Sequence, residues 1–308
     1  MNPFLLCFIR YCQRHIKYNT TQEEFWNFSI DQMAAFDIPA MINYTVSLTK
    51  QSKIFFFGHS QGAMVLFARL SSDMDLSSKI KLFLAVGPVA HLSNLIGPIK
   101  YVAEFGLDRW FELFGRKDFL PSNALTQDIA DKLCGHFWID EILCKNGINI
   151  ISGPSDNLNT TRIPVYLSHC KYFLIKKTKY ILKIKKKTLF QFQDPAGTST
   201  KTINHYSQLV VNKKFQMYDY GAHDNLIFYN QSTAPIYDIR KIQVPVALYT
   251  GGSDWLADLN DVNILRQSLP NIVDDYTVEG WDHSDLVWAT NATLVYYKRM
   301  IQFMSKFK

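Results

Sequence analysis

A serine between two glycines is the residue of this sequence best placed to do chemistry. The sequence Gly-His-Ser-Gln-Gly at 58–62 follows an apolar run at 53–57 and precedes a segment, 63–70, with apolar residues at helical spacing. A strand, a sharp turn and a helix in this order would lift the serine hydroxyl clear of a sheet, and the glycines leave room for elements that pass close. We therefore expect Ser60 to be a nucleophile. The start of the helix would direct its dipole and the Gln61 amide toward a developing oxyanion.

Asp254 and His283 are the predicted partners of this serine. A serine hydroxyl becomes a good nucleophile when a histidine removes its proton, and that histidine needs an acid that fixes its tautomer. Asp254 lies in a Gly-Gly-Ser-Asp loop just after an apolar run, and His283 lies between the last strand-like segment and the final helix. The chain order Ser, Asp, His fits this arrangement. Asp258, four residues after Asp254, is the alternative acid.

The other histidines fit packing or solvation better than catalysis. His59 is too close to Ser60 along the chain to turn back as its base. The rest are His15, His91, His136, His169, His205 and His223. No pair of them has spacing typical of a zinc site, so we propose no metal and expect no cofactor.

The elements that must position these residues follow an α/β pattern. Apolar runs at 53–57, 80–86 and 244–249 end near glycines and are separated by helical stretches, which predicts a mostly parallel sheet with helices on both faces. A helix at 261–268, a strand at 273–278 and a final helix from 285 complete the pattern. In that helix, Leu294, Tyr297, Ile301 and Met304 repeat at helical spacing and predict a core face.

The region between the second and third apolar runs has a different residue pattern, which predicts a cap above the sheet. From 91 to 237, aromatic and polar segments alternate without a clear sheet pattern. We therefore divide the chain into a first part of the core at 14–90, a cap or lid at 91–237, and a last part of the core at 238–308.

Composition excludes several classes of protein. With 308 residues and 47% hydrophobic content, the chain can bury the core of one large domain with an insertion or of two ordinary domains. The net charge of +6 depends on eight lysines between 171 and 187, without which it would be −2. We therefore expect no nucleic-acid surface. No run approaches the roughly 20 apolar residues of a transmembrane helix.

Cysteines and glycosylation motifs bear on the compartment. Cys134 and Cys144 lie ten residues apart, and both one disulfide and two free thiols remain open at this point. Residues 4–9 are apolar but lack a basic segment and a clear cleavage site, so we predict no signal peptide there. Six Asn-x-Ser/Thr motifs are typical of a secretory-pathway protein: Asn19, Asn27, Asn43, Asn159, Asn230 and Asn291.

Beyond these residues the sequence resembles the acid lipase family, which contains lysosomal acid lipase and gastric lipase. The similar segments cover most of 14–305 and are FWNFS (25–29), DIPA (37–40), GHSQG (58–62), TRIPVYLSH (161–169), PAGTS (195–199), GGSDWLAD (251–258) and DHSD (282–285). The resemblance implies an α/β-hydrolase fold with a lid, which acts on triacylglycerols or sterol esters at a lipid–water interface in a secreted or lysosomal setting. It carries nucleophile, acid and base onto Ser60, Asp254 and His283, and it favours a bridge between Cys134 and Cys144.

Two departures from the family pattern lead to further expectations. Family members begin upstream with early strands and a His-Gly loop that donates a second oxyanion amide, whereas the similarity here begins near residue 14. We therefore expect a chain truncated at its N-terminus, without the early strands. Extra residues follow His169, and we predict that 171–193 is a non-native insertion such as a retained intron. A basic helix at a membrane surface is the alternative.

Together these observations predict a lipid ester hydrolase that works through an acyl-enzyme on Ser60. A non-catalytic or inactive truncated relative that only binds lipid is the alternative of a different class. A small-ester esterase without lipid preference is a third interpretation.

Overall fold

The computed structural model describes residues 15–104, 117–119, 148–158 and 198–307. Several predicted features lie outside these ranges: Cys134, Cys144, His136, His169, Asn159 and the insertion at 171–193. Among the helices that the structure describes, none combines the length and the apolar character that a bilayer span requires.

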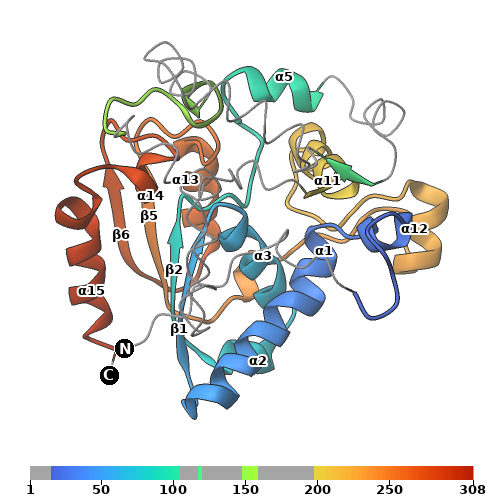
Figure 1. Ribbon diagram of the computed structural model, residues 1–308, viewed down its shortest axis with the longest axis horizontal. Coiled ribbons are helices and arrows are strands. Elements are labelled where there is room, and N and C mark those ends of the chain that lie inside the picture. Colours follow the sequence, from blue (N-terminus) through green and yellow to red (C-terminus); the bar gives the residue numbers. More distant parts are fainter. Residues whose placement is uncertain (1–14, 105–116, 120–147, 159–197, 308) are drawn as a thin grey trace, which may run out of the picture.

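A parallel sheet forms the centre of the molecule (Figure 1). Its four strands are β1 (Ile54–His59), β2 (Ile80–Val86), β5 (Val246–Gly251) and β6 (Ile272–Val278), in the order β1-β2-β5-β6. All three neighbouring pairs are parallel, which confirms the predicted sheet. His59 is in register with Val86, and Val86 with Tyr249. The loops that follow the strands therefore meet at one edge.

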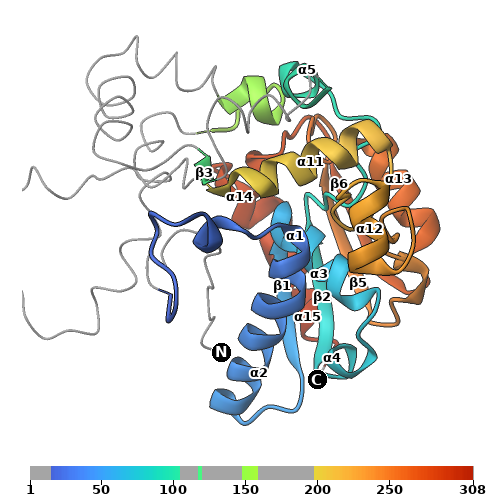
Figure 2. The ribbon, with the colours of Figure 1, turned by 90° about the vertical axis from the view of Figure 1, so that its right-hand side faces the viewer.

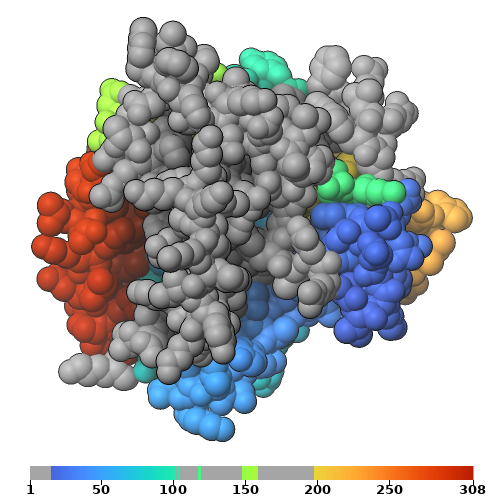
Figure 3. All heavy atoms as spheres, in the orientation of Figure 1, coloured from blue at the N-terminus to red at the C-terminus, as the bar shows by residue number. Residues whose placement is uncertain are grey.

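Helices cover both faces of the sheet. Residues 30–49 form one helical run made of α1 (Ile30–Gln32), a π-helical turn (Met33–Asp37) and α2 (Ile38–Thr49). The other helices of the core are α3 (Gln61–Leu70), α4 (Met74–Ser78), α13 (Leu259–Ser268), α14 (Asp285–Trp288), a π-helical turn (Thr293–Tyr297) and α15 (Lys298–Met304). The C-terminal helix forms one flank of the molecule and residues 15–50 lie toward the opposite flank (Figures 1 and 3).

Alternating strand residues supply two separate cores. Phe83 and Ala85 of β2 pack in the cluster that contains α3, whereas Leu82 and Leu84 pack in the cluster that contains the C-terminal helix. This follows from the two-residue period of a strand, which sends successive side chains to opposite faces. Helix α3 is buried at seven of its ten positions. Helix α3, which begins directly after Ser60, is therefore packed against neighbouring elements on most of its sides.

The predicted core face of the last helix was correct for Tyr297 and Met304, which pack against the buried cluster, and wrong for Leu294 and Ile301. Leu294 and Ile301 are 69% and 65% exposed, whereas Tyr296 and Met300 are 0% and 4% exposed. The hydroxyl of Tyr296 donates a hydrogen bond to the Leu286 carbonyl. Tyr296, Met300 and Phe303 also repeat at helical spacing, so the sequence offers a second apolar stripe beside the predicted one. Contacts such as that of Tyr296 with α14 decide which residues are buried most deeply.

The described parts of the predicted cap contain α5 (Pro98–Glu104), a two-stranded antiparallel ribbon of β3 (Asp118–Phe119) and β4 (Thr198–Ser199), α11 (Thr200–Asn212) and α12 (Ala222–Tyr229). A short 3-10 helix, Ile239–Lys241, leads back to β5. Helix α5 and residues 148–158 lie at the end of the sheet where its strands finish (Figures 1 and 2). The boundaries at 91 and 237 remain a prediction.

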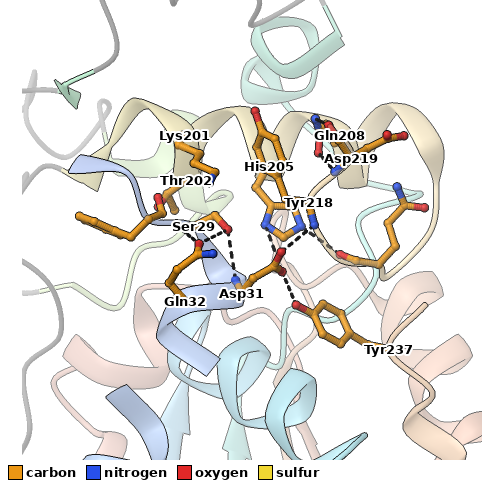
Figure 4. Close-up of polar contacts among 12 residues, drawn as sticks. Ser29, Asp31, Gln32, Lys201, Thr202, His205, Gln208, Tyr218, Asp219 and Tyr237 are labelled. Carbon is orange, nitrogen blue, oxygen red and sulfur yellow. Dashed lines mark hydrogen bonds and ion pairs between the residues drawn. The ribbon is translucent and has the colours of Figure 1, made fainter. Parts of the chain in front are cut away.

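A buried carboxylate joins the first helical run to the chain after β4 (Figure 4). Asp31 is 6% exposed and accepts hydrogen bonds from the Tyr237 hydroxyl and, at 2.9 Å, from the Tyr218 backbone N–H. His205 Nδ1 lies 3.9 Å from the same carboxylate. Burial, and then the charge of Asp31, raise the pKa of Tyr237 well above its usual range. Tyr237 therefore stays a donor, and Asp31 anchors α1 to the segment that carries Tyr218 and Tyr237.

Candidate active site

Ser60 occupies a strained turn between β1 and α3. Its φ is 54° and its ψ is −119°, a backbone region that residues with a side chain rarely enter. Its N–H donates to the Val86 carbonyl of β2 at 3.0 Å, and its own carbonyl accepts from Ala63 and Met64 at 3.0 and 3.1 Å. Neighbouring strand and helix thus hold the serine in this conformation.

The two glycines around Ser60 have different roles. A Cβ on Gly58 would lie 2.9 Å from the Ala63 nitrogen, so this glycine is required where strand and helix pass close. A Cβ on Gly62 would meet no atom within 4 Å among the described residues. The prediction that both positions need a small residue is therefore correct for Gly58 and is not supported at Gly62.

Gln61 is the first residue of α3, where a backbone N–H has no acceptor within its own helix. Its side-chain amide donates to Met33 Sδ at 3.1 Å. The side chain is thereby tied to the first helical run, and the backbone N–H remains at the turn beside Ser60.

His283 and Asp254 form a buried pair at the ends of neighbouring strands. His283 Nδ1 lies 2.7 Å from Asp254 Oδ2, and both residues are buried. The other oxygen of Asp254 accepts the N–H groups of Leu256 and Ala257, both at 2.8 Å. The carboxylate is therefore fixed by its own loop and directs one oxygen at the imidazole.

The alternative acid has another partner. Asp258 precedes α13, and its Oδ1 accepts the Asn260 N–H at 2.8 Å, the geometry of a helix N-cap. The structure thus brings Asp254, and not Asp258, to His283.

The ring of His283 is enclosed by small and aromatic neighbours. Gly87 follows β2 with φ +49°, and a Cβ there would lie 3.0 Å from His283 Cε1. The His59 ring is tilted against the His283 ring with their centroids 4.7 Å apart. His283 Nε2 is buried and has no hydrogen-bond partner among the described residues. With Nδ1 on Asp254, Nε2 is the nitrogen that can accept a proton.

Sequence reasoning missed the carboxyl of Asp282, next to the histidine. Asp282 is 0% exposed, its Oδ1 accepts the Asp285 N–H at 2.8 Å, and its Oδ2 has no partner among the described residues. Burial, and to a smaller degree the charges of Asp285 and Asp254, raise the pKa of Asp282 to about 7. The adjacent Asp-His pair in the sequence was visible, but its burial was not.

The other described histidines lie apart from this pair. His15 and His223 are exposed, the ring of His91 packs edge-on against Phe215, and His205 Nε2 lies 2.9 Å from the Gln216 carbonyl oxygen. Burial lowers the pKa of both His91 and His205. Among the described residues, no three His, Cys, Asp or Glu side chains gather as a metal site would require.

A parallel sheet, a strained serine between strand and helix, and a buried His–Asp pair on the loops after later strands define an α/β-hydrolase. No family model matches the chain. The chain is 35% identical over 298 residues to rat lysosomal acid lipase/cholesteryl ester hydrolase (Rattus norvegicus), and this alignment covers 96% of the present chain and 69% of the rat protein. It is 34% identical over 296 residues to mouse gastric triacylglycerol lipase (Mus musculus), and that alignment covers 96% of the present chain and 69% of the mouse protein.

The chain therefore belongs to the acid lipase family, a family of serine ester hydrolases, as the resemblance implied. Among solved structures, a soluble variant of monoglyceride lipase from Saccharomyces cerevisiae matches with a TM-score of 0.48 and 12% identity, over 93% of this chain and 73% of that one.

Proposed function

We propose that this chain hydrolyses carboxylic esters of neutral lipids, with Ser60 as nucleophile, His283 as general base and Asp254 as the acid that orients it. The proposal depends above all on the 2.7 Å contact between His283 Nδ1 and Asp254 Oδ2. That contact fixes the imidazole tautomer and leaves Nε2 for the proton of a serine hydroxyl.

The reaction divides into two half-reactions. His283 Nε2 takes the Ser60 proton while Oγ attacks the acyl carbonyl, and the oxyanion that forms accepts the Gln61 N–H. Collapse of the intermediate expels the alcohol, which receives the proton from His283. Water then attacks the acyl-enzyme by the same route and frees the fatty acid. Throughout, Asp254 stabilises the imidazolium and keeps its orientation.

The choice of a neutral lipid rests on two observations. The relatives include proteins named cholesteryl ester hydrolase and triacylglycerol lipase. Large apolar side chains are also exposed at the end of the sheet where the candidate site lies, on α5 and on neighbouring segments: Ile96, Tyr101, Ile150 and Ile151. Exposed apolar surface of this kind suits contact with a lipid–water interface.

We place the protein in the secretory or lysosomal route. Relatives carry the names lysosomal and gastric lipase. All five glycosylation motifs in the described residues present an exposed asparagine: Asn19, Asn27, Asn43, Asn230 and Asn291. Exposure is what attachment of a glycan requires.

Hydrolysis of a long-chain fluorogenic ester at acidic and neutral pH tests the proposal. Ser60→Ala should abolish turnover, and Asp254→Asn should lower kcat by about 10⁴-fold because the imidazole tautomer is no longer held. Asp258→Asn is the matched control, since asparagine caps a helix as well as aspartate does. Equal losses in Asp254→Asn and Asp258→Asn would refute the assignment of the acid.

A fluorophosphonate label separates the enzyme from the lipid-binding alternative. The label should attach to the full chain and not to Ser60→Ala. Binding of triacylglycerol emulsion without labelling and without hydrolysis would establish the non-catalytic interpretation instead. Activity confined to short-chain esters would identify a general esterase.

A further inference from the structure

Residues 149–158, which we call the strap (light green in Figure 1), contact both the loop that carries Asp254 and the loop that carries His283. The Ser152 carbonyl accepts the N–H of Trp255 at 3.1 Å and the N–H of His283 at 3.2 Å. One carbonyl therefore receives donors from the residue beside Asp254 and from His283 itself. The Ser284 hydroxyl also donates to the Ser152 hydroxyl at 2.6 Å.

A second connection runs through the side chain of Asp285. Ser155 Oγ donates to Asp285 Oδ1 at 2.7 Å, and Asn157 Nδ2 donates to Asp285 Oδ2 at 3.1 Å. Asp285 is fully buried, and a buried carboxylate is tolerated only when such donors satisfy it. The Asp282 N–H also donates to Asp285 Oδ2, at 3.1 Å. Asp285 thus ties the loop on both sides of His283 to the strap.

The strap backbone itself fits closely against the acid loop. Gly153 has φ +115°, and a Cβ there would lie less than 3.0 Å from the Ser253 carbonyl oxygen. Within the strap, Gly153 N–H donates to the Asn149 carbonyl at 2.9 Å, and Asn149 Nδ2 donates to the Ser155 carbonyl at 3.2 Å. The strap is therefore a turn that its own hydrogen bonds stabilise, and it contacts both the loop with Asp254 and the loop with His283.

We propose that Ser155 and Asn157 are positioning residues. Through Asp285 they hold the His283 imidazole in the orientation that its contact with Asp254 and its reaction with Ser60 require; this inference rests on the proposed function. Neither side chain touches the reacting atoms. Their side chains supply two of the hydrogen-bond donors that fix Asp285, and through it the loop that carries His283. Loss of either donor lets the imidazole leave its productive orientation. Because misplacement of a catalytic group by about 1 Å can cost 100-fold in rate, such losses appear in kcat.

Ser155→Ala and Asn157→Ala in the full chain test the proposal, with Ser71→Ala as the matched control. Ser71 is 6% exposed against 7% for Ser155, and its hydroxyl makes a hydrogen bond of the same length, 2.7 Å, to the Ala68 carbonyl, away from both loops. We expect kcat to fall about 10-fold or more in the strap variants with KM unchanged, and neither to change in Ser71→Ala.

The low-field proton resonance of His283 Nδ1, assigned by its loss in Asp254→Asn, is the second measurement. In the strap variants it should shift and exchange faster with solvent, and in Ser71→Ala it should not. Asn157 is only half-buried, so Asn157→Ala tests the idea even if Ser155→Ala unfolds. Strap variants that match Ser71→Ala in kcat and in this resonance would overturn the inference. If the parent chain hydrolyses no ester, the proposed function fails, and the resonance still decides whether the strap holds His283.

Discussion

The imidazole of His59 lies against the imidazole of His283, with ring centroids 4.7 Å apart and planes tilted by 36°. His59 Nε2 is 3.2 Å from the His283 carbonyl oxygen. Burial, and then the neighbouring His283, lower the pKa of His59 to about 3. His59 is therefore a neutral ring that packs beside the candidate base, even in acidic surroundings.

His59 should make the fold less stable as the pH falls. The unfolded chain takes up a proton on this histidine near pH 6.5, whereas the folded chain does so only near pH 3, so protons favour unfolding between these values. In His59→Gln, the free energy of unfolding should drop less on acidification over this range. Urea denaturation at a series of pH values measures this, with the exposed His15→Gln as control. A slope equal to that of the parent chain would contradict the prediction.

Asp282 should act in the opposite direction. Its pKa of about 7 in the folded state, against 3.8 for an ordinary aspartate, means that the folded chain holds a proton that the unfolded chain releases. Stability therefore falls as the pH rises from 3.8 to about 7. In Asp282→Asn, this loss should disappear, so the unfolding free energy rises more steeply with pH than in the parent chain. Asp224→Asn, at an exposed position of α12, is the control, and parallel curves for all three proteins would contradict the assignment.

Gly58 and Gly62 should respond differently to alanine. At Gly58 the added Cβ would lie 2.9 Å from backbone atoms of α3, so Gly58→Ala should destabilise the fold by about 1–3 kcal/mol. At Gly62 there is space among the described residues, and alanine favours a helix by about 1 kcal/mol over glycine. Gly62→Ala should therefore be neutral or stabilising. Calorimetric Tm values compare the two, and an equal loss in both would show that sterics at Gly58 are not the cause.

Glycine in place of Ser60 should stabilise the fold while it removes activity. The φ of 54° and ψ of −119° suit glycine, so Ser60→Gly releases strain that Ser60→Ala retains. Glycine also raises the conformational entropy of the unfolded chain, which offsets part of the strain released. We therefore expect the unfolding free energy of Ser60→Gly to exceed that of Ser60→Ala by about 1 kcal/mol. Both variants should be inactive. Equal stability in urea titrations would mean that the turn is not strained.

The exposed sequon asparagines should carry glycans when the chain is secreted from a eukaryotic host behind a heterologous leader. Treatment with an amidase that removes N-linked glycans should then lower the apparent mass, and Asn→Gln variants at Asn43 and Asn230 should each remove one step. Both residues are exposed in the structure. Unchanged mobility after treatment would contradict the proposed route through the secretory pathway.

Local patterns in the sequence were enough to predict much of this molecule. An apolar run followed by Gly-His-Ser-Gln-Gly and an apolar helix encodes the turn at Ser60, because strand period, turn sterics and helix period all act between near neighbours. The same patterns predicted the parallel sheet and placed Asp254 and His283 on loops after strands, where the structure brings them to 2.7 Å.

Only the tertiary structure decided between alternatives that look equal along the chain. Asp254 and Asp258 are four residues apart, and packing turned one toward His283 and made the other a helix cap. Packing likewise chose Tyr296 and Met300 over Leu294 and Ile301 as the buried side of the last helix. The strap has no signature in the sequence, because Ser155 gains its role from Asp285, which is 130 residues away along the chain. Contacts of that separation arise from the packing of the whole core, which no local period encodes.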